Sequence, residues 1–325
     1  MRGGIFLPVN ISIGVKMKTF TDWLIEQSID ERALNIGNKS AMPAFNQAVI
    51  LAGGAGSGKG MVLNNILNIP NAKVFDVDKL KTDILTLRPK SMAAAFEKQT
   101  GRKLETVDLG KPEDVALMHQ FVSDNKYDKK VIDQFFISTG DFWPDGTPKK
   151  EPNKNKPNVV FDVTLKDEKK MFDLCAKLQH YGWDKKDIHL VWILNDFEVA
   201  SIQNQSRARK VPEKIFAQTH VGASNTMKEI VTNFKKFAKC MDGEIWIVPN
   251  QRNVDNVFEF SGKNQKGDPI LKLKFYTAMK VKERGAAVPN ADEVLSKHFT
   301  KEGKQGESLE SLIAKYVPVD ADKWQ

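Results

Sequence analysis

The sequence predicts an α/β protein in which helices cover both faces of a mostly parallel sheet. Strand-like apolar runs recur along the chain, and helical patterns lie between several of them. The runs cover residues 47–53, 72–78, 158–164, 188–194 and 244–250. Continuous apolar strands joined by helices are typical of a parallel sheet that is buried on both faces. We therefore expect a three-layer domain that spans residues 46–250.

The composition is that of a soluble globular protein with an excess of positive charge. Hydrophobic residues make up 41% and charged residues 28% of the 325 residues, and the formal net charge is +8. These values exclude a chain that is disordered throughout. A positive potential steers anions toward the protein, so the charge suits a nucleotide or a nucleic acid, although many soluble proteins carry such an excess.

Cysteine usage and the opening residues bear on the compartment. The two cysteines, Cys175 and Cys240, lie far apart and lack CxxC spacing. This usage argues against a disulfide framework or a zinc knuckle and is typical of a reducing compartment. The apolar opening of the chain is interrupted by Pro8 and Asn10 and is too short to span a bilayer. We therefore expect a cytoplasmic protein without a membrane segment.

Two segments outside the strand pattern precede the third apolar run. Residues 19–36 have the apolar spacing of a short amphipathic helix, so we expect residues 1–45 to form an N-terminal extension with that helix. Residues 83–157 hold helical stretches at 91–101 and 112–136 and then a linker rich in Pro, Lys and Asn. We expect this insertion to lie beside the active site.

The rest of the chain follows the same reasoning. Residues 167–183 have apolar side chains at helical spacing, and Gly182 provides a stop signal. Residues 257–276 have the pattern of a β-hairpin with a polar turn, and residues 306–317 that of a final helix. Residues 251–325 are therefore expected to form a small C-terminal extension of hairpin and helix.

A glycine-rich turn follows the first apolar run. The segment "GGAGSGKG" places Gly53, Gly58 and Lys59 in the spacing GxxxxGK, and a helical pattern follows it. In this motif backbone N–H groups wrap a phosphate, glycines leave room for the oxygens, and the lysine reaches the β- and γ-phosphates. We therefore predict an ATP site on a three-layer P-loop NTPase or kinase fold. The candidate nucleotide-binding residues are Gly53, Gly54, Ala55, Gly56, Ser57, Gly58, Lys59, Gly60 and Met61.

The loop departs from the common motif just after its lysine. A Ser or Thr hydroxyl usually binds Mg²⁺ there, but this chain has Gly60 and then Met61. Magnesium must then be held by water, by acidic side chains or by the phosphates. A protein that binds ATP without turnover is the alternative that this departure leaves open.

The second apolar run ends in a pair of aspartates. In small P-loop kinases a carboxylate at this strand end faces the γ-phosphate and can accept a proton from the acceptor hydroxyl. Asp78 is the candidate base. Asp76 points to the same face of an ideal strand, so it competes for this role or helps to hold Mg²⁺. Lys81 is expected to contact an anionic acceptor, while solvated aspartates or a helix N-cap are the structural alternative.

The third and fourth runs lead to further charged residues. Asp162 ends an apolar strand of Walker-B type, whose carboxylate can hold the water shell of the metal, so Asp162 is the candidate magnesium residue. Arg207 and Arg209 follow a helical pattern after the fourth run. Arginines there can neutralise charge on the transferred phosphoryl group, and Pro212 predicts a hinged lid. A basic surface run is the alternative.

The order of these motifs resembles the zeta-toxin family of P-loop kinases, which are relatives of polynucleotide kinases and chloramphenicol phosphotransferase. The resemblance covers roughly residues 47–250 and is carried by "GGAGSGKG", "FDVDKLK", "VVFDVTLK" and "SRARKVP". It implies that Lys59 binds the ATP phosphates, that Asp78 is the base and that the two arginines serve the nucleotide. The residues that it implies for the acceptor pocket are Asp162, Thr164 and Lys166. The chain has Val163 where that family commonly has Gly, which affects this pocket.

The leading hypothesis is an ATP-dependent phosphotransferase with a small anionic acceptor. The resemblance implies phosphorylation of the sugar of UDP-N-acetylglucosamine and a neutralising protein partner. A polynucleotide 5′-hydroxyl kinase is the first alternative, which the net charge of +8 and the lysine-rich linker favour. A non-catalytic ATP-binding structural or assembly protein is the second.

Overall fold

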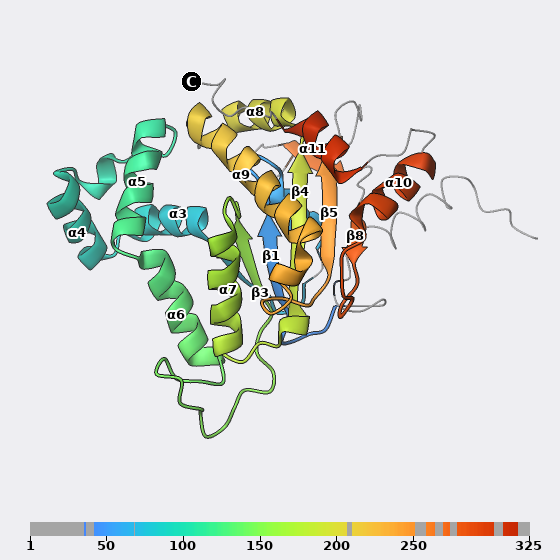
Figure 1. The fold of residues 1–325 in the computed structure, drawn as a ribbon. Helices are drawn as coiled ribbons and strands as arrows, with labels where there is room; N and C mark the ends of the chain where they lie inside the picture. The colour runs from blue at the N-terminus through green and yellow to red at the C-terminus, as the bar shows by residue number, and fades with distance from the viewer. Residues whose placement is uncertain are drawn as a thin grey trace, which may run out of the picture.

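The computed structural model describes residues 36, 42–67, 69–206, 210–250, 258–263, 269–273, 278–301 and 308–317. Helices cover both faces of a central six-stranded sheet (Figure 1). The strand order is β2-β3-β1-β4-β5-β8, in which the first five strands are parallel and β8 is antiparallel to β5. The α/β fold class predicted from the sequence is therefore confirmed.

The elements follow the predicted runs closely. The strands of the sheet are β1 (Ala48–Ala52), β2 (Lys73–Asp76), β3 (Val159–Val163), β4 (Ile188–Asn195), β5 (Ile245–Asn250) and β8 (Met279–Lys282). The helices are α2 (Lys59–Asn65), α3 (Val77–Leu87), α4 (Lys90–Thr100), α5 (Pro112–Asp124), α6 (Tyr127–Thr139), α7 (Glu168–His180), α8 (Phe197–Ser206), α9 (Glu213–Thr232), α10 (Ala291–Lys301) and α11 (Leu309–Tyr316).

Strand β1 shows how one apolar strand serves two cores. All five of its residues are buried. Ile50 belongs to a cluster with side chains of α7, α9 and α11, whereas Val49 and Leu51 belong to a second cluster with side chains of α2. Successive side chains of a strand point to opposite faces. A strand without polar positions therefore supplies both layers of the core, as the sequence pattern predicts.

The insertion contributes three helices, of which α4 and α5 stand beside the sheet (Figure 1). The end of α3 packs with α4 and α5 around a separate cluster, formed by Ile84, Phe96, Leu104, Met118, Phe121 and Val122. The helical stretch expected at 112–136 is divided in two, because Lys126 adopts a φ of 54° before α6. Phe136 on α6 returns to the main core, where its ring stacks on Tyr181 at 5.1 Å.

The linker leads to the edge of the sheet at which the parallel strands begin. Most of residues 143–155 are exposed, but Lys156 is buried and pairs with Asp141 at 2.9 Å. The end of the linker is bonded to the chain before β1, because the N–H of Lys156 donates to Asn46 Oδ1 at 2.9 Å. The chain then continues into β3. The linker leads to the start of the parallel strand β3. Parallel strands all start at the same edge of the sheet, opposite the edge formed by their carboxyl ends.

The chain beyond β5 also joins the sheet. Strands β6 (Phe258–Lys263) and β7 (Pro269–Leu273) form the expected hairpin, and α11 is the expected final helix. The sequence analysis missed β8 and α10, although β8 completes the edge of the sheet. The helix expected at 19–36 lies outside the described residues apart from Ile36, which is buried. In the described part of the chain, no helix is long and apolar enough to cross a membrane.

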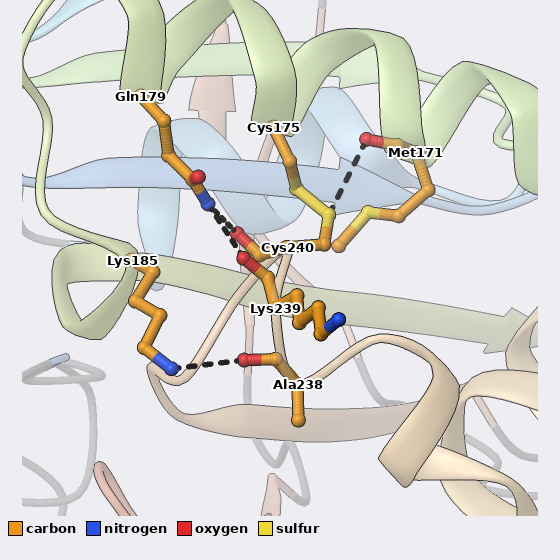
Figure 2. The surroundings of a disulfide bond; sticks show 7 residues. All are labelled: Met171, Cys175, Gln179, Lys185, Ala238, Lys239 and Cys240. Atoms are coloured by element: carbon orange, nitrogen blue, oxygen red, sulfur yellow. Dashed lines mark hydrogen bonds between the residues drawn. A yellow bond between two sulfur atoms is a disulfide. The ribbon is translucent and has the colours of Figure 1, made fainter.

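A disulfide joins α7 to the turn before β5 (Figure 2). Cys175 and Cys240 are both buried, and their Cα atoms are 5.3 Å apart. Gln179 donates from its amide to the carbonyl oxygen of Lys239 at 3.0 Å beside the bond. The expectation of unpaired cysteines is wrong, because a separation of 65 residues in the sequence conceals their approach in the fold. The argument from unpaired cysteines to a reducing compartment therefore does not hold.

Reduction of this disulfide should lower the free energy of unfolding. A crosslink that closes a loop of this length removes about 4 kcal/mol of conformational entropy from the unfolded chain in the loop-closure treatment. Urea unfolding of the oxidised and the reduced protein measures the difference. The double variant Cys175→Ser, Cys240→Ser is the control, whose midpoint a reductant should leave unchanged. Equal midpoints for the oxidised and the reduced wild-type protein would contradict the prediction.

A buried histidine at the start of β4 is held in one neutral tautomer. His189 Nδ1 accepts from the N–H of Glu244 at 2.9 Å, and Nε2 lies 3.0 Å from Gln47 Oε1. Because an amide N–H only donates, Nδ1 carries no proton and Nε2 donates to the glutamine oxygen. Burial, followed by the positive charges of Arg284 and Lys282, lowers the pKa of His189 to about 3.

This histidine should make the protein less stable as the pH falls from 6.5 toward 3. Below pH 6.5 His189 binds a proton in the unfolded chain but stays neutral in the folded chain, so a falling pH favours unfolding. In His189→Asn, the amide oxygen replaces Nδ1 as acceptor without titrating. The difference in unfolding free energy between wild type and variant should shrink by about 1.5 kcal/mol between pH 6.5 and pH 5. Chemical denaturation at each pH measures it, and a constant difference would refute the assignment.

Candidate active site

The phosphate loop connects β1 to α2 and spans residues 53–58. Its backbone requires glycine at Gly56 and Gly58, whose φ angles are 72° and 94°. L-residues rarely adopt such angles, so these glycines permit the tight curve of the loop. The loop N–H of Ser57 donates internally to Gly54 O at 3.2 Å. The loop thus has the local geometry that the GxxxxGK spacing predicts.

Lys59 folds its side chain back over the loop. Its Nζ donates to Gly53 O at 2.9 Å and to Gly54 O at 3.1 Å, and lies 3.8 Å from Asp162 Oδ1. The side chains of Lys59 and Asp162 are only 13% and 15% exposed. This partly desolvated ammonium group therefore lies between the mouth of the loop and the carboxyl end of β3.

The remaining loop residues differ in exposure. Ser57 is buried, and among the described residues its Oγ has no hydrogen-bond partner. Gly60 is exposed, with open space where a side chain would begin, and Met61 is half-buried against the cluster around α2. The position after the lysine thus offers no hydroxyl to a metal ion.

The two aspartates after the second run have different structural roles. Strand β2 ends at Asp76 and helix α3 begins at Val77, so the expected strand through residue 78 is too long. Asp76 Oδ1 accepts the N–H of Asp78 at 2.7 Å and caps the helix. Aspartate is a preferred N-cap because its oxygen satisfies an otherwise unpaired amide of the first turn. The cap weighed as an alternative is therefore present at Asp76, while Asp78 lies in the first helical turn.

Asp78 forms an ion pair within α3. Lys81 Nζ lies 3.0 Å from Asp78 Oδ1, and the side chains are 5% and 46% exposed respectively. The lysine is thus buried beside a carboxylate that solvent reaches. A substrate hydroxyl that approaches from the solvent side can contact Asp78, while Lys81 supplies positive charge behind it.

His119 on α5 is a residue of this region that the sequence analysis did not assign. Desolvation, followed by the positive charge of Lys81, lowers its pKa, although the residue is still exposed on its surface. Asp78 raises the pKa and Lys166 lowers it further. His119 is therefore close enough to Asp78, Lys81 and Lys166 to feel their charges. No pattern in the sequence around His119 indicates this proximity, because it arises from the fold.

Asp162 lies level with the other strand ends. In the parallel register it is the partner of Leu51 on β1 and of Asp76 on β2. Neighbouring strands lie about 4.8 Å apart, so the two carboxylates flank one another at the same edge. Carboxylate oxygens suit Mg²⁺, which commonly keeps several waters and binds substrate phosphates. These residues therefore fit a magnesium ion held largely by phosphates and water.

The segment after β3 carries the implied acceptor residues Thr164 and Lys166. Thr164 is half-buried and Lys166 is exposed. Between them Leu165 is buried and adopts a φ of 50°, which an L-residue of this kind rarely does. Such strain costs on the order of 1–3 kcal/mol and persists where the surroundings impose it.

The arginines expected to serve the nucleotide, Arg207 and Arg209, lie outside the described residues. The helices on either side of them are described. The side chain of Asn204 on α8 donates to Val211 O at 2.9 Å and accepts from Val211 N at 3.0 Å. Pro212 is the N-cap of α9. The two ends of the arginine segment are therefore tied together by one buried asparagine.

The end of β4 and the residue after it supply two further polar side chains that the sequence analysis did not assign. Asn195 is buried at its end and donates from Nδ2 to Gly56 O at 3.3 Å. Asp196 Oδ1 accepts from the N–H of Glu198 at 2.9 Å and caps α8. Both residues directly follow the apolar run 188–194. Polar residues at the end of a predicted parallel strand could therefore have identified them as site candidates.

Removal of the cap at Asp76 should lower stability, whereas removal of the exposed carboxylate of Asp83 on the same helix should not. Asp76→Ala deprives the first turn of α3 of its acceptor and should cost about 1 kcal/mol of unfolding free energy. Asp76→Asn keeps an oxygen at the cap and should stay close to wild type. Asp83→Asn, which removes an exposed ion pair with Lys79, is the matched comparison, and urea unfolding reports all three. A loss in Asp83→Asn as large as that in Asp76→Ala would contradict the role assigned to Asp76.

Comparisons with known proteins give structural likenesses only. No protein-family model matches the chain, and no curated protein does. The chain is similar to the complex AvrRxo1-ORF1:AvrRxo1-ORF2 with sulphate ions, at 12% identity and a TM-score of 0.36, with 92% of this chain and 87% of that chain covered. For the same complex with ATP the values are 11%, 0.36, 84% and 81%. For the PezAT chromosomal toxin-antitoxin system of Streptococcus pneumoniae they are 12%, 0.39, 91% and 91%. Likenesses at these values carry no argument about activity, so the site stands on its own geometry.

Proposed function

We propose that the protein is an ATP-dependent phosphotransferase that moves the γ-phosphate to a hydroxyl of a small anionic acceptor. UDP-N-acetylglucosamine is the leading acceptor, as the zeta-toxin resemblance implies. The observation that carries the proposal is the position of Lys59, 3.8 Å from the strand-end carboxylate of Asp162 at the mouth of a glycine-rich loop. The half-exposed carboxylate of Asp78 lies just beyond the neighbouring strand end.

The loop and Lys59 provide the donor side. In the proposed complex Lys59 leaves the carbonyl oxygens of Gly53 and Gly54 and binds the phosphates, which carry full negative charge. Asp162 and Asp76 would hold the water shell of Mg²⁺, which supplies charge neutralisation when bound. Arg207 and Arg209 are proposed to add positive charge at the transferred group. Binding, orientation and charge neutralisation are the main contributions of a protein to phosphoryl transfer.

Asp78 provides the acceptor side. Its carboxylate accepts the proton of the acceptor hydroxyl as the new oxygen–phosphorus bond forms and the bond from the γ-phosphorus to the β-phosphate bridging oxygen breaks. The products are ADP and the phosphorylated acceptor. A carboxylate with 46% of its side chain exposed is open to a small substrate. General base catalysis of this kind contributes typically about 10²–10⁴-fold.

The positive residues around Asp78 favour an anionic acceptor. Lys81 is buried beside the carboxylate, and Lys166 is exposed on the loop after β3. The positive charges of both lysines lower the pKa of His119. We propose that Lys81, Lys166 and Thr164 bind the acceptor, with His119 as a polar neighbour. A neutralising protein partner stays a prediction from the resemblance.

The test is transfer of labelled γ-phosphate from Mg-ATP to UDP-N-acetylglucosamine. Asp78→Asn should lower the rate about 10²–10⁴-fold, because the proton acceptor is removed. Lys59→Ala should abolish transfer and weaken ATP binding. The matched control is Asp83→Asn, on the same helix, which removes a surface ion pair with Lys79 at 2.8 Å and should keep the wild-type rate.

The outcomes separate the three functions. Labelled sugar nucleotide that disappears in both site variants supports the proposal. Transfer to a 5′-hydroxyl oligonucleotide instead, with the same dependence on Lys59 and Asp78, would replace it with the polynucleotide kinase. ATP binding without transfer to either acceptor would favour the non-catalytic protein.

A further inference from the structure

Two consecutive side chains of α9 bind both backbone groups of Ala55, in the middle of the phosphate loop. The N–H of Ala55 donates to Thr219 Oγ1 at 3.0 Å, and His220 Nε2 lies 2.7 Å from the carbonyl oxygen of Ala55. Thr219 in turn donates to Phe216 O at 2.7 Å. Both side chains belong to buried residues, so these hydrogen bonds are shielded from competing water.

The tautomer of His220 follows from its partner. A carbonyl oxygen only accepts, so Nε2 must carry the hydrogen. Burial, which outweighs the hydrogen bond to Ala55, and then the positive charge of Lys59 lower the pKa of His220 to about 4. The imidazole is therefore a neutral donor at physiological pH and adds no charge beneath the loop.

The two hydrogen bonds orient the two peptide units that meet at Ala55. In a planar trans peptide the C=O and the N–H point in opposite directions. The peptide that binds Thr219 through Ala55 N–H therefore points Gly54 O away from α9, where Lys59 Nζ donates to it at 3.1 Å. The peptide that binds His220 through Ala55 O likewise points the N–H of Gly56 away from α9.

The flanking residues explain why such a restraint is needed. Gly54 and Gly56 have no side chain to resist rotation of their peptide planes. A Cβ atom at Gly54 would lie 2.4 Å from His220 Cγ, so the imidazole packs directly against the loop backbone. On the same helix, a Cβ atom at Gly222 would lie 2.8 Å from Lys166 O. Helix α9 thus contacts both the phosphate loop and the loop after β3.

We infer that Thr219 and His220 are positioning residues for the nucleotide: they hold the peptide units on either side of Ala55 in the orientation that binds phosphate. The inference rests on the proposed ATP site. It predicts that each hydrogen bond contributes to nucleotide affinity even though neither side chain contacts the nucleotide. Loss of one of these hydrogen bonds frees its peptide unit to rotate. Only a fraction of the protein then has the orientation that binds Mg-ATP, so the apparent affinity falls.

The experiment compares paired substitutions that keep or remove one polar atom. Thr219→Val removes the hydroxyl at nearly constant shape, and Thr219→Ser retains it. His220→Leu removes the donor, and His220→Gln offers an amide N–H in place of Nε2. Mg-ATP binding is measured by isothermal titration calorimetry, with urea unfolding of each variant in parallel. We expect Thr219→Val and His220→Leu to bind Mg-ATP about fivefold more weakly and the Ser and Gln variants to lie within about twofold of wild type.

The results distinguish this inference from the proposed function. Wild-type protein that fails to bind Mg-ATP would overturn both, and Lys59→Ala defines that baseline. Wild-type binding that is matched by Thr219→Val and His220→Leu would overturn the positioning role alone. Equal weakening of binding by Thr219→Val and Thr219→Ser would also overturn it, because the hydroxyl would then be irrelevant. If His220→Leu does not fold, the valine and serine pair decides the matter.

Discussion

The site depends on the register of three parallel strands. Leu51, Asp162 and Asp76 are aligned across β1, β3 and β2, so the phosphate loop, the Walker-B-type aspartate and the start of α3 all follow from one edge of the sheet. Burial on both faces enforces this register, because a slip of one residue would exchange the side chains that Ile50 and its neighbours present to the two cores. The same apolar packing that stabilises the domain therefore brings separate charged residues together.

Charge at this edge is satisfied by contacts within the chain. Lys59 is bound by two carbonyl oxygens and lies beside Asp162, while Lys81 pairs with Asp78. In the proposed function a phosphate group must compete with these contacts, which it can do because it offers more negative charge than neutral carbonyl groups. Buried ammonium groups without such partners would be costly. The internal contacts thus stabilise the two ammonium groups, and under the proposed function they would favour strongly anionic ligands.

Local patterns in the sequence predicted the features that depend on neighbouring residues. The apolar runs, the glycine spacing before Lys59 and the stop at Gly182 are of this kind. The prediction failed where tertiary structure decides. Strand β2 ends before the predicted residue 78, because the side-chain oxygen of Asp76 caps a helix that begins there. The disulfide between Cys175 and Cys240 joins segments whose proximity no local sequence pattern indicates. Because His220 contacts a loop 165 residues away, no spacing rule identifies it.

The fixed contacts of α8 and α9 also limit how this site can move. Asn195, just before α8, donates to Gly56, and α9 binds Ala55 through two side chains. Phe197 on α8 packs against Phe216 on α9 with ring centroids 5.0 Å apart. A lid motion that carried both helices away from the loop would break these hydrogen bonds and expose the aromatic pair. The two helices therefore act as part of the support for the phosphate loop, and the hinge expected at Pro212 would have to work without displacing them.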